Sequence, residues 1–356
     1  MRKILTAALL AICCGAMAQT PISKYKPGVT PEGAVYYLPK TALRIVVQVE
    51  KTTYTPGDFC IYADRFLRLK DVETEKTVDY KVTTINMTSV GVADTSKCYS
   101  IKLNPKSSAT NIRLADDGTL TAINAEPTAP EVPAAFVPAP KKAPVNPRQF
   151  MNEDILAAGS TAKMAQLTAQ EIYDIRESKS LLTRGQADFM PKDGAQMKLM
   201  LEQLDTQDKA LTSLFAGTTE KDTTEHVFIV CPDKEISKEV LFRLSRRLGI
   251  VDKDDLSGTP YYISVTDLHS IPAADPVEPA GKRKQQDNGI FVNVPGKIKA
   301  TISKGNHMMG SFELYAGQFG HTELLSSELF NKRFSTRLIL NPTTGSVARL
   351  DAEQPK

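Results

Sequence analysis

The stretch Leu43-Arg44-Ile45-Val46-Val47-Gln48-Val49-Glu50 decides the fold class of the N-terminal part of this chain. Its alternate apolar residues share one face of an extended strand, and its charged and amide residues share the other. This pattern predicts a strand with one buried face. The runs Tyr80-Lys81-Val82 and Ser100-Ile101-Lys102-Leu103 repeat the alternation, so we expect several half-buried strands between residues 33 and 124.

A short helix and a hairpin are predicted among these strands. From Asp58 to Leu69, apolar residues recur at helical spacing after a Pro56-Gly57 break, and the Asp58 side chain is a suitable N-cap. Around Asp116-Asp117-Gly118, two short apolar runs between residues 112 and 123 indicate a hairpin. We therefore assign residues 19–125 to an N-terminal α+β domain.

Residues 126–148 form a proline-rich linker with interspersed alanines. Because proline disfavours both helix and sheet, the segment is predicted to be an extended spacer. The alternative is a polyproline ligand that docks on a partner.

Residues 149–220 are predicted to form an antiparallel helical hairpin. In its first helix, which Asn152 can cap, apolar residues recur at alternating gaps of three and four: Met151, Ile155, Ala158, Ala162, Ala165, Ala169 and Ile172. The second helix begins after Asp193 and stops at Gly217, and Asp208 interrupts its apolar seam. The alanine-rich seam of the first helix permits close approach of the second.

Residues 221–356 are predicted to be a second α+β domain. We expect a strand at 227–230, an amphipathic helix at 233–248, strands from Tyr261 onward and a hairpin between 338 and 350. A polar loop with three prolines and a Lys-Arg-Lys triplet occupies residues 272–289.

The two α+β segments resemble one another in spacing. Tyr80 is nine positions after Asp71, and Tyr261 is nine positions after Asp252; each interval follows a predicted helix and leads into a strand. We therefore expect an α+β fold with two small strand-helix-strand domains, related by an internal duplication. The proline-rich linker and the helical hairpin would separate them.

The first eighteen residues have the pattern of a signal peptide. Arg2 and Lys3 precede an apolar stretch that is too short to span a bilayer, and Ala16-Met17-Ala18 fits a cleavage site. A lipoprotein is the alternative, because Cys13 and Cys14 follow Leu10. We expect an exported protein in the periplasm or associated with the outer membrane, without a transmembrane segment after cleavage.

The charge balance argues against binding to nucleic acids. With 44 Lys and Arg against 41 Asp and Glu, the net charge is +3, and removal of residues 1–18 lowers it further. Such a chain has no overall attraction for a phosphate backbone or an anionic membrane.

The sequence supports no catalytic, cofactor-binding or metal-binding assignment. It contains no Gly-x-Ser-x-Gly, Walker, His-Glu-x-x-His or Cys-x-x-Cys motif. Cys231 follows an apolar strand near His226, but the odd spacing places these two side chains on opposite strand faces. His321 and Glu323 share a face but lack the further ligands that zinc requires. Among the mature cysteines, Cys60 and Cys98 could form a disulfide; separate buried thiols are the alternative.

Longer runs resemble an exported Bacteroidetes family catalogued as domain of unknown function 4831. They extend over nearly the whole mature chain and include Tyr37-Leu38-Pro39-Lys40-Thr41, Pro56-Gly57-Asp58-Phe59-Cys60, Ala157-Ala158-Gly159-Ser160-Thr161-Ala162, Glu171-Ile172-Tyr173-Asp174-Ile175-Arg176, Leu241-Phe242-Arg243, Ala316-Gly317-Gln318-Phe319-Gly320 and Leu329-Phe330-Asn331-Lys332. The resemblance implies a Bacteroidetes source and an envelope location. It implies no activity and no catalytic residue.

In such an organism, Asp222-Thr223-Thr224 resembles a short O-glycosylation sequon of exported proteins, with Thr223 as the candidate acceptor. An exposed junction that merely contains Asp and Thr is the alternative. For the whole chain, we expect a non-enzymatic envelope or periplasmic interaction or scaffold protein that binds a protein partner. The alternative is a periplasmic hydrolase or small-ligand binder that uses an interdomain cleft.

Overall fold

The computed structural model describes residues 27–30, 33–102, 109–129, 133–138, 140–141, 143, 145–191, 193–272, 289–331 and 333–353. The predicted signal peptide at 1–18 and nearly all of the predicted polar loop at 272–289 lie outside these residues. Among the helices of the described part, none combines the length and the apolar character that a membrane span requires.

The described part of the chain is mostly β-structure, with 49% strand and 23% helix. The strands are β1 (Gly28–Thr30), β2 (Gly33–Thr55), β3 (Thr77–Lys102), β4 (Ile112–Leu114), β5 (Leu120–Ile123), β6 (Thr218–Val230), β7 (Ile236–Ser245), β8 (Gly249–Val251), β9 (Thr259–Asp267), β10 (Gly289–Lys304), β11 (His307–Ser326), β12 (Ser335–Leu340) and β13 (Val347–Glu353). The helices are η1 (Cys60–Tyr62), α1 (Ala63–Leu67), η2 (Pro147–Phe150), α2 (Glu153–Leu156), α3 (Thr161–Arg184), α4 (Gly194–Ala216) and η3 (Ser327–Phe330).

These strands form three antiparallel sheets. The long sheet contains β1, β2, β3 and β6, with β2 paired to the other three. The five-stranded sheet has the order β11-β10-β9-β7-β8, and the basal sheet has the order β13-β12-β5-β4. The α+β prediction is therefore wrong, because three antiparallel sheets make up most of the structure and the helix content is modest.

Strand β2 supplies both of its faces to hydrophobic cores. In the middle of the strand, one face carries Leu43, Ile45, Val47 and Val49, which pack against the five-stranded sheet. Nearer the start of the strand, Tyr36 and Leu38 lie on the opposite face. They belong to a second core, which includes residues of the basal sheet. The alternation in the opening stretch thus predicted a strand correctly, but a strand of 23 residues extends far beyond that stretch.

The predicted helix at 233–248 is wrong, because this segment forms β7. The pairing of β7 with β9 is irregular between Ile236 and Glu239 and again between Val240 and Phe242. Lys238 has a positive φ of 50°, which marks the first irregularity. Bulges shift the alternation of a strand, so its apolar residues recur at three- and four-residue gaps that imitate a helix.

The prediction of two separate duplicated domains is also wrong. Strand β5, from the N-terminal segment, pairs with β12 near the C-terminus, and β2 pairs with β6 along thirteen residues. Segments from both halves therefore share two of the three sheets. The similar spacing of the two segments does not reflect a duplication, because the segment that corresponds to α1 in the second one is the strand β7.

The helix expected at 58–69 is shorter than predicted. Only η1 and α1 form, and Asp58 caps neither of them. The two predicted hairpins are present, as β4–β5 around Gly118 and as β12–β13.

The helical segment contains two long helices, α3 and α4, and Asp193 caps the second of them as predicted. The Asp193 side chain accepts a hydrogen bond from Gln196 N at 2.8 Å, and α4 ends at Gly217. The predicted first helix is interrupted: Asn152 caps only the short α2, and Ser160 caps α3. Gly159, between these two helices, is a poor helix former.

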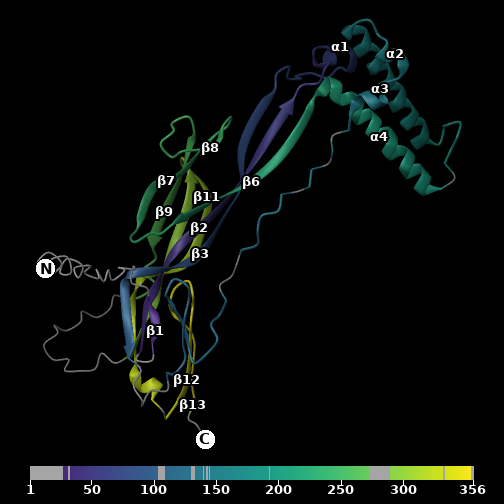
Figure 1. Cartoon of the computed structure of the whole chain (residues 1–356). Helices are drawn as coiled ribbons and strands as arrows, with labels where there is room; N and C mark the ends of the chain where they lie inside the picture. The colour runs from purple at the N-terminus through teal and green to yellow at the C-terminus, as the bar shows by residue number, and fades with distance from the viewer. Residues whose placement is uncertain are drawn as a thin grey trace, which may run out of the picture.

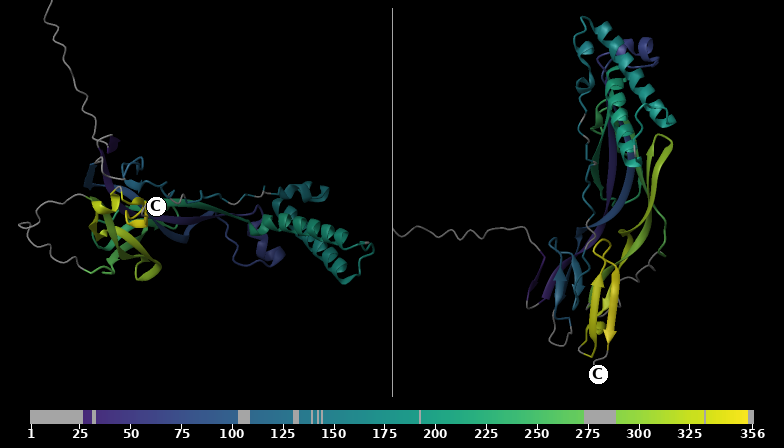
Figure 2. Two further views of the ribbon diagram at one scale, coloured as in Figure 1. Left: turned by 90° about the horizontal axis from the view of Figure 1, so that it is seen from below. Right: turned by 90° about the vertical axis from the view of Figure 1, so that its right-hand side faces the viewer.

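The molecule is elongated, with a helical head at one end and the basal sheet at the other (Figure 1). At about 3.3 Å per residue, the 23-residue β2 is about 75 Å long and joins these two regions. The described parts of the proline-rich linker lie beside the stalk formed by the long and five-stranded sheets, between the base and the head (Figures 1 and 2).

Candidate functional site

A buried polar network lies at the waist, where the long sheet, the five-stranded sheet and the β12–β13 turn meet. Asn293 on β10 is 1% exposed, and its Nδ2 donates to Pro39 O at 2.8 Å and to Thr344 O at 2.9 Å. Its Oδ1 accepts from Lys97 Nζ at 3.3 Å. One side chain thus connects β2, β3, β10 and the last hairpin.

Thr41 and Gln318 extend this network. Thr41 N donates to Gln318 Oε1 at 2.8 Å, and Gln318 Nε2 donates back to Thr41 O at 2.7 Å. Gln318 Nε2 also donates to Pro232 O at 3.0 Å. Two of the runs that carry the family resemblance therefore meet here, and their polar atoms satisfy one another and the backbone.

Gly317 is needed at this junction. A Cβ on Gly317 would lie 2.8 Å from both Asn293 Nδ2 and Thr344 O, inside normal contact distance. The waist is therefore packed, and the described residues around Asn293 leave no space for a ligand between these atoms.

Cys231 lies at the edge of the waist, after β6. The Lys40 amine forms an ion pair with Asp233 at 3.0 Å, which raises the pKa of Lys40. Burial raises the pKa of the Cys231 thiol, and the nearby Lys40 offsets this effect only in part. A raised pKa disfavours the thiolate, which is the form that attacks a substrate.

The other two described cysteines are far apart. Cys60 follows the head end of β2, whereas Cys98 on β3 lies opposite Tyr37. Eighteen strand residues separate Tyr37 from Thr55, a span of about 60 Å. Cys60 and Cys98 are both free thiols, and they are too distant to form an intramolecular disulfide.

The two histidines that the sequence pointed to, His226 and His321, each contact one neighbouring side chain. His321 and Glu323 share a strand face, as predicted, with Nε2 and Oε1 2.9 Å apart. His226 contacts Thr224 Oγ1 at 3.2 Å. Within the described ranges, no three His, Cys, Asp or Glu side chains gather in a way that could hold a metal ion.

Thr223 lies within β6 and is half-buried, not in an exposed junction. Glu50 on β2 is its paired residue, and the neighbouring Asp222 forms an ion pair with Lys141 of the linker at 3.1 Å.

The head has a small core of its own, beside the end of β2. Ala165, Ala169 and Ile172 of α3 pack with Leu211 and Phe215 of α4, and residues of η1 and α1 complete the cluster. Ala165 and Ala169 of the predicted seam thus pack against α4, whereas Ala158 and Ala162 are not among the buried residues of this core. Asp208, which interrupts the second seam, forms an ion pair with Arg176 at 3.0 Å.

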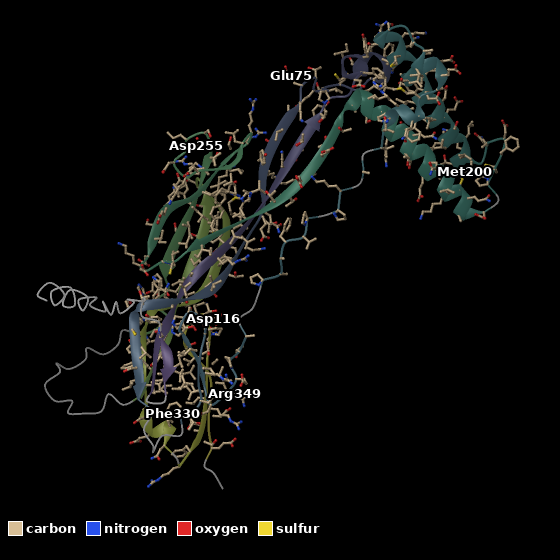
Figure 3. The ribbon with its side chains drawn as sticks, in the orientation of Figure 1. Glu75, Asp116, Met200, Asp255, Phe330 and Arg349 are labelled. Carbon is tan, nitrogen blue, oxygen red and sulfur yellow. The ribbon has the colours of Figure 1, made fainter. Side chains whose placement is uncertain are left out.

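The far end of the head exposes large apolar side chains. Phe189 is 89% exposed, Leu199 58% and Met200 40%. Figure 3 shows Met200 on the head, at the opposite end of the molecule from Phe330 and Arg349. These residues, with Leu181 and Met190, are called the head tip. The sequence pattern predicts packing for the apolar seams of the two helices and singles out none of these five residues. The signal that could have identified them is their position outside the three- and four-residue spacing of the packed helix seams.

The chain belongs to the family described as Domain of unknown function (DUF4831), whose model matches residues 32–348. This match confirms the resemblance that the sequence runs carry. Comparison with curated proteins finds no match, and neither does comparison with solved structures.

Proposed function

We propose that this chain is an exported, non-enzymatic interaction or scaffold protein of the cell envelope of a Bacteroidetes bacterium. In this proposal, the β-stalk holds the helical head away from the base, and the head tip binds a protein partner. The exposed apolar side chains of the head tip are the observation that carries it.

The exposed area supports this role. The five residues of the head tip are between 36% and 89% exposed. Gathered exposed apolar side chains on soluble proteins often mark interaction sites. The first eighteen residues, with their charged start and A-x-A site, support export.

The stalk supports the role through its stiffness. Twenty-two residue pairs join β2 to β3, and thirteen join β2 to β6. The packed waist fixes this ribbon against the other two sheets through Asn293 and Gln318. A head carried on such a stalk is positioned at a set distance from the base.

The alternative role, a hydrolase or small-ligand binder, draws no comparable support from the described residues. Lys179 and Lys297 hold the pKa values of Asp205 and Glu313 below their usual range, and Ser257 does the same for Asp255. General acid catalysis needs a carboxyl group whose pKa is raised.

O-glycosylation of Thr223 stays part of the proposal. Because Thr223 is half-buried in a strand, attachment would have to precede the pairing of β6 with β2. Export with a glycan would raise the intact mass of envelope-purified protein.

Lysine crosslinking in intact cells, followed by fractionation and mass spectrometry, tests the proposed function. We expect the protein in the periplasmic or outer-membrane fraction, with crosslinks to other proteins concentrated on Lys163, Lys198 and Lys209 of the head. The matched control is Lys253 in the β8–β9 turn, which is exposed like the head lysines. A cytoplasmic location, or partners crosslinked only through the stalk, would contradict the proposal.

A further inference from the structure

One edge of β6 is unpaired. Within the described chain, β6 pairs only with β2, so the backbone groups of its other edge have no strand partner there. The last four residues of β6, Val227-Phe228-Ile229-Val230, are all apolar. Edge strands are normally protected by charged residues, by proline or by a covering segment, because bare edges pair with other chains. This apolar run has no charge and no proline, so a covering segment is the protection that remains.

The proline-rich linker lies beside β6. Lys141 of the linker forms an ion pair with Asp222 of β6 at 3.1 Å, and the described parts of the linker lie on the β6 side of the stalk (Figure 1). Phe136 is half-buried, whereas its neighbours Ala135 and Val137 are exposed. The shielding of one ring between exposed neighbours indicates a second contact with the body of the protein, in addition to the ion pair.

The spacing of these two linker residues places Phe136 level with the apolar run. An extended proline-rich segment rises about 3.1 Å per residue, so Phe136 lies about 15 Å from Lys141 in the direction of the base. Strand β6 runs in the same direction and covers this distance in about five residues, which leads from Asp222 to Val227. The ion pair and the ring therefore flank the free edge at two levels.

We propose that residues 133–141 form a strap that shields the free edge of β6 and prevents it from pairing with β6 of a second copy. Pro133, Pro138 and Pro140 have no amide hydrogen, so the strap covers the edge without adding a strand to the sheet. Because the strap is tethered to the same chain, its effective concentration at the edge is far above that of a second copy. The linker thus has a role besides connecting the base to the head.

Crosslinking of cysteine pairs tests where the strap lies, in a background with the mature cysteines changed to serine. A short bis-maleimide should join Phe136→Cys to Val227→Cys within one chain. Thr219→Cys is the matched partner for comparison: it is also exposed on β6, but it lies about 26 Å from Val227 towards the head. Linkage of Phe136→Cys to position 219 in place of position 227, or to neither, would overturn the proposal.

Sedimentation velocity of the purified exported form tests what the strap does. We expect a monomer for the wild type and a concentration-dependent dimer for the double variant Phe136→Asp, Lys141→Glu, because both contacts of the strap are lost. Adding Ile229→Lys should restore the monomer, since a charge on a free edge blocks strand pairing. Ile229 is 70% exposed, so the fold should tolerate this change.

Val137→Asp is the matched control, because it places the same charge on the exposed neighbour of Phe136 and should leave the protein monomeric. A wild type that dimerises, a double variant that stays monomeric, or a dimer that Ile229→Lys leaves intact would overturn the proposal. None of these results bears on the head tip, so the proposed function is tested separately.

Discussion

Asn293 joins separate parts of the waist through one buried amide. Both of its Nδ2 protons are donated to backbone carbonyls, on Pro39 and on Thr344, that lie more than 250 and about 50 residues away in sequence. Its exposure of 1% means that water cannot replace these bonds. A side chain of this kind holds distant strands together, and the structure gives it no reacting group to act on.

We expect Asn293→Ala to lower the free energy of unfolding by about 2–4 kcal/mol, because it leaves buried carbonyls without a donor and opens a cavity. Urea denaturation measures this change. Asn86→Ala is the matched control, since Asn86 is exposed on β3 and should change stability by less than about 0.5 kcal/mol. Equal effects of the two changes would show that the waist network does not stabilise the fold.

At the scale of elements, sequence patterns identified those that obey one simple period. The strand around Leu43–Glu50, the β12–β13 hairpin and the caps at Asn152 and Asp193 follow from alternation or capping chemistry. The pattern failed for β7, because bulges changed its period, and it failed for the domain plan, because β5–β12 and β2–β6 pairing is non-local. The head tip was missed because exposure depends on which faces other elements leave uncovered.

The two long head helices should separate more easily in acid. Lys179 forms an ion pair with Asp205, and this bond holds the pKa of Asp205 below its usual range. A lowered folded-state pKa gives stability above the unfolded-state value, and this stability is lost as pH falls through the folded-state pKa. Asp205→Asn should therefore reduce the loss of thermal stability between neutral pH and about pH 3.

Thermal unfolding followed by circular dichroism at several pH values measures this effect. Asp188→Asn, in the exposed turn between α3 and α4, is the matched control and should keep the wild-type pH profile. If Asp205→Asn leaves that profile unchanged, the Lys179 contact has no role in holding α3 to α4.

At the scale of the whole molecule, the head, the waist and the basal sheet lie one after another along the long axis. The helical head lies at one end, the packed waist lies where the three sheets meet, and the basal sheet lies at the other end (Figure 1). Large exposed apolar side chains lie at the head tip, whereas the buried amide of Asn293 holds the waist together. This separation is what the proposed role of an interaction protein requires.

Photo-crosslinking in intact cells tests the central claim most directly. A benzophenone amino acid is placed at Leu199 in the head tip or, as the control, at Leu256 in the β8–β9 turn; both side chains are exposed. We predict that irradiation gives high-mass adducts with another envelope protein from position 199 and none from position 256. Adducts from position 256 without any from position 199 would contradict the claim that the head binds the partner.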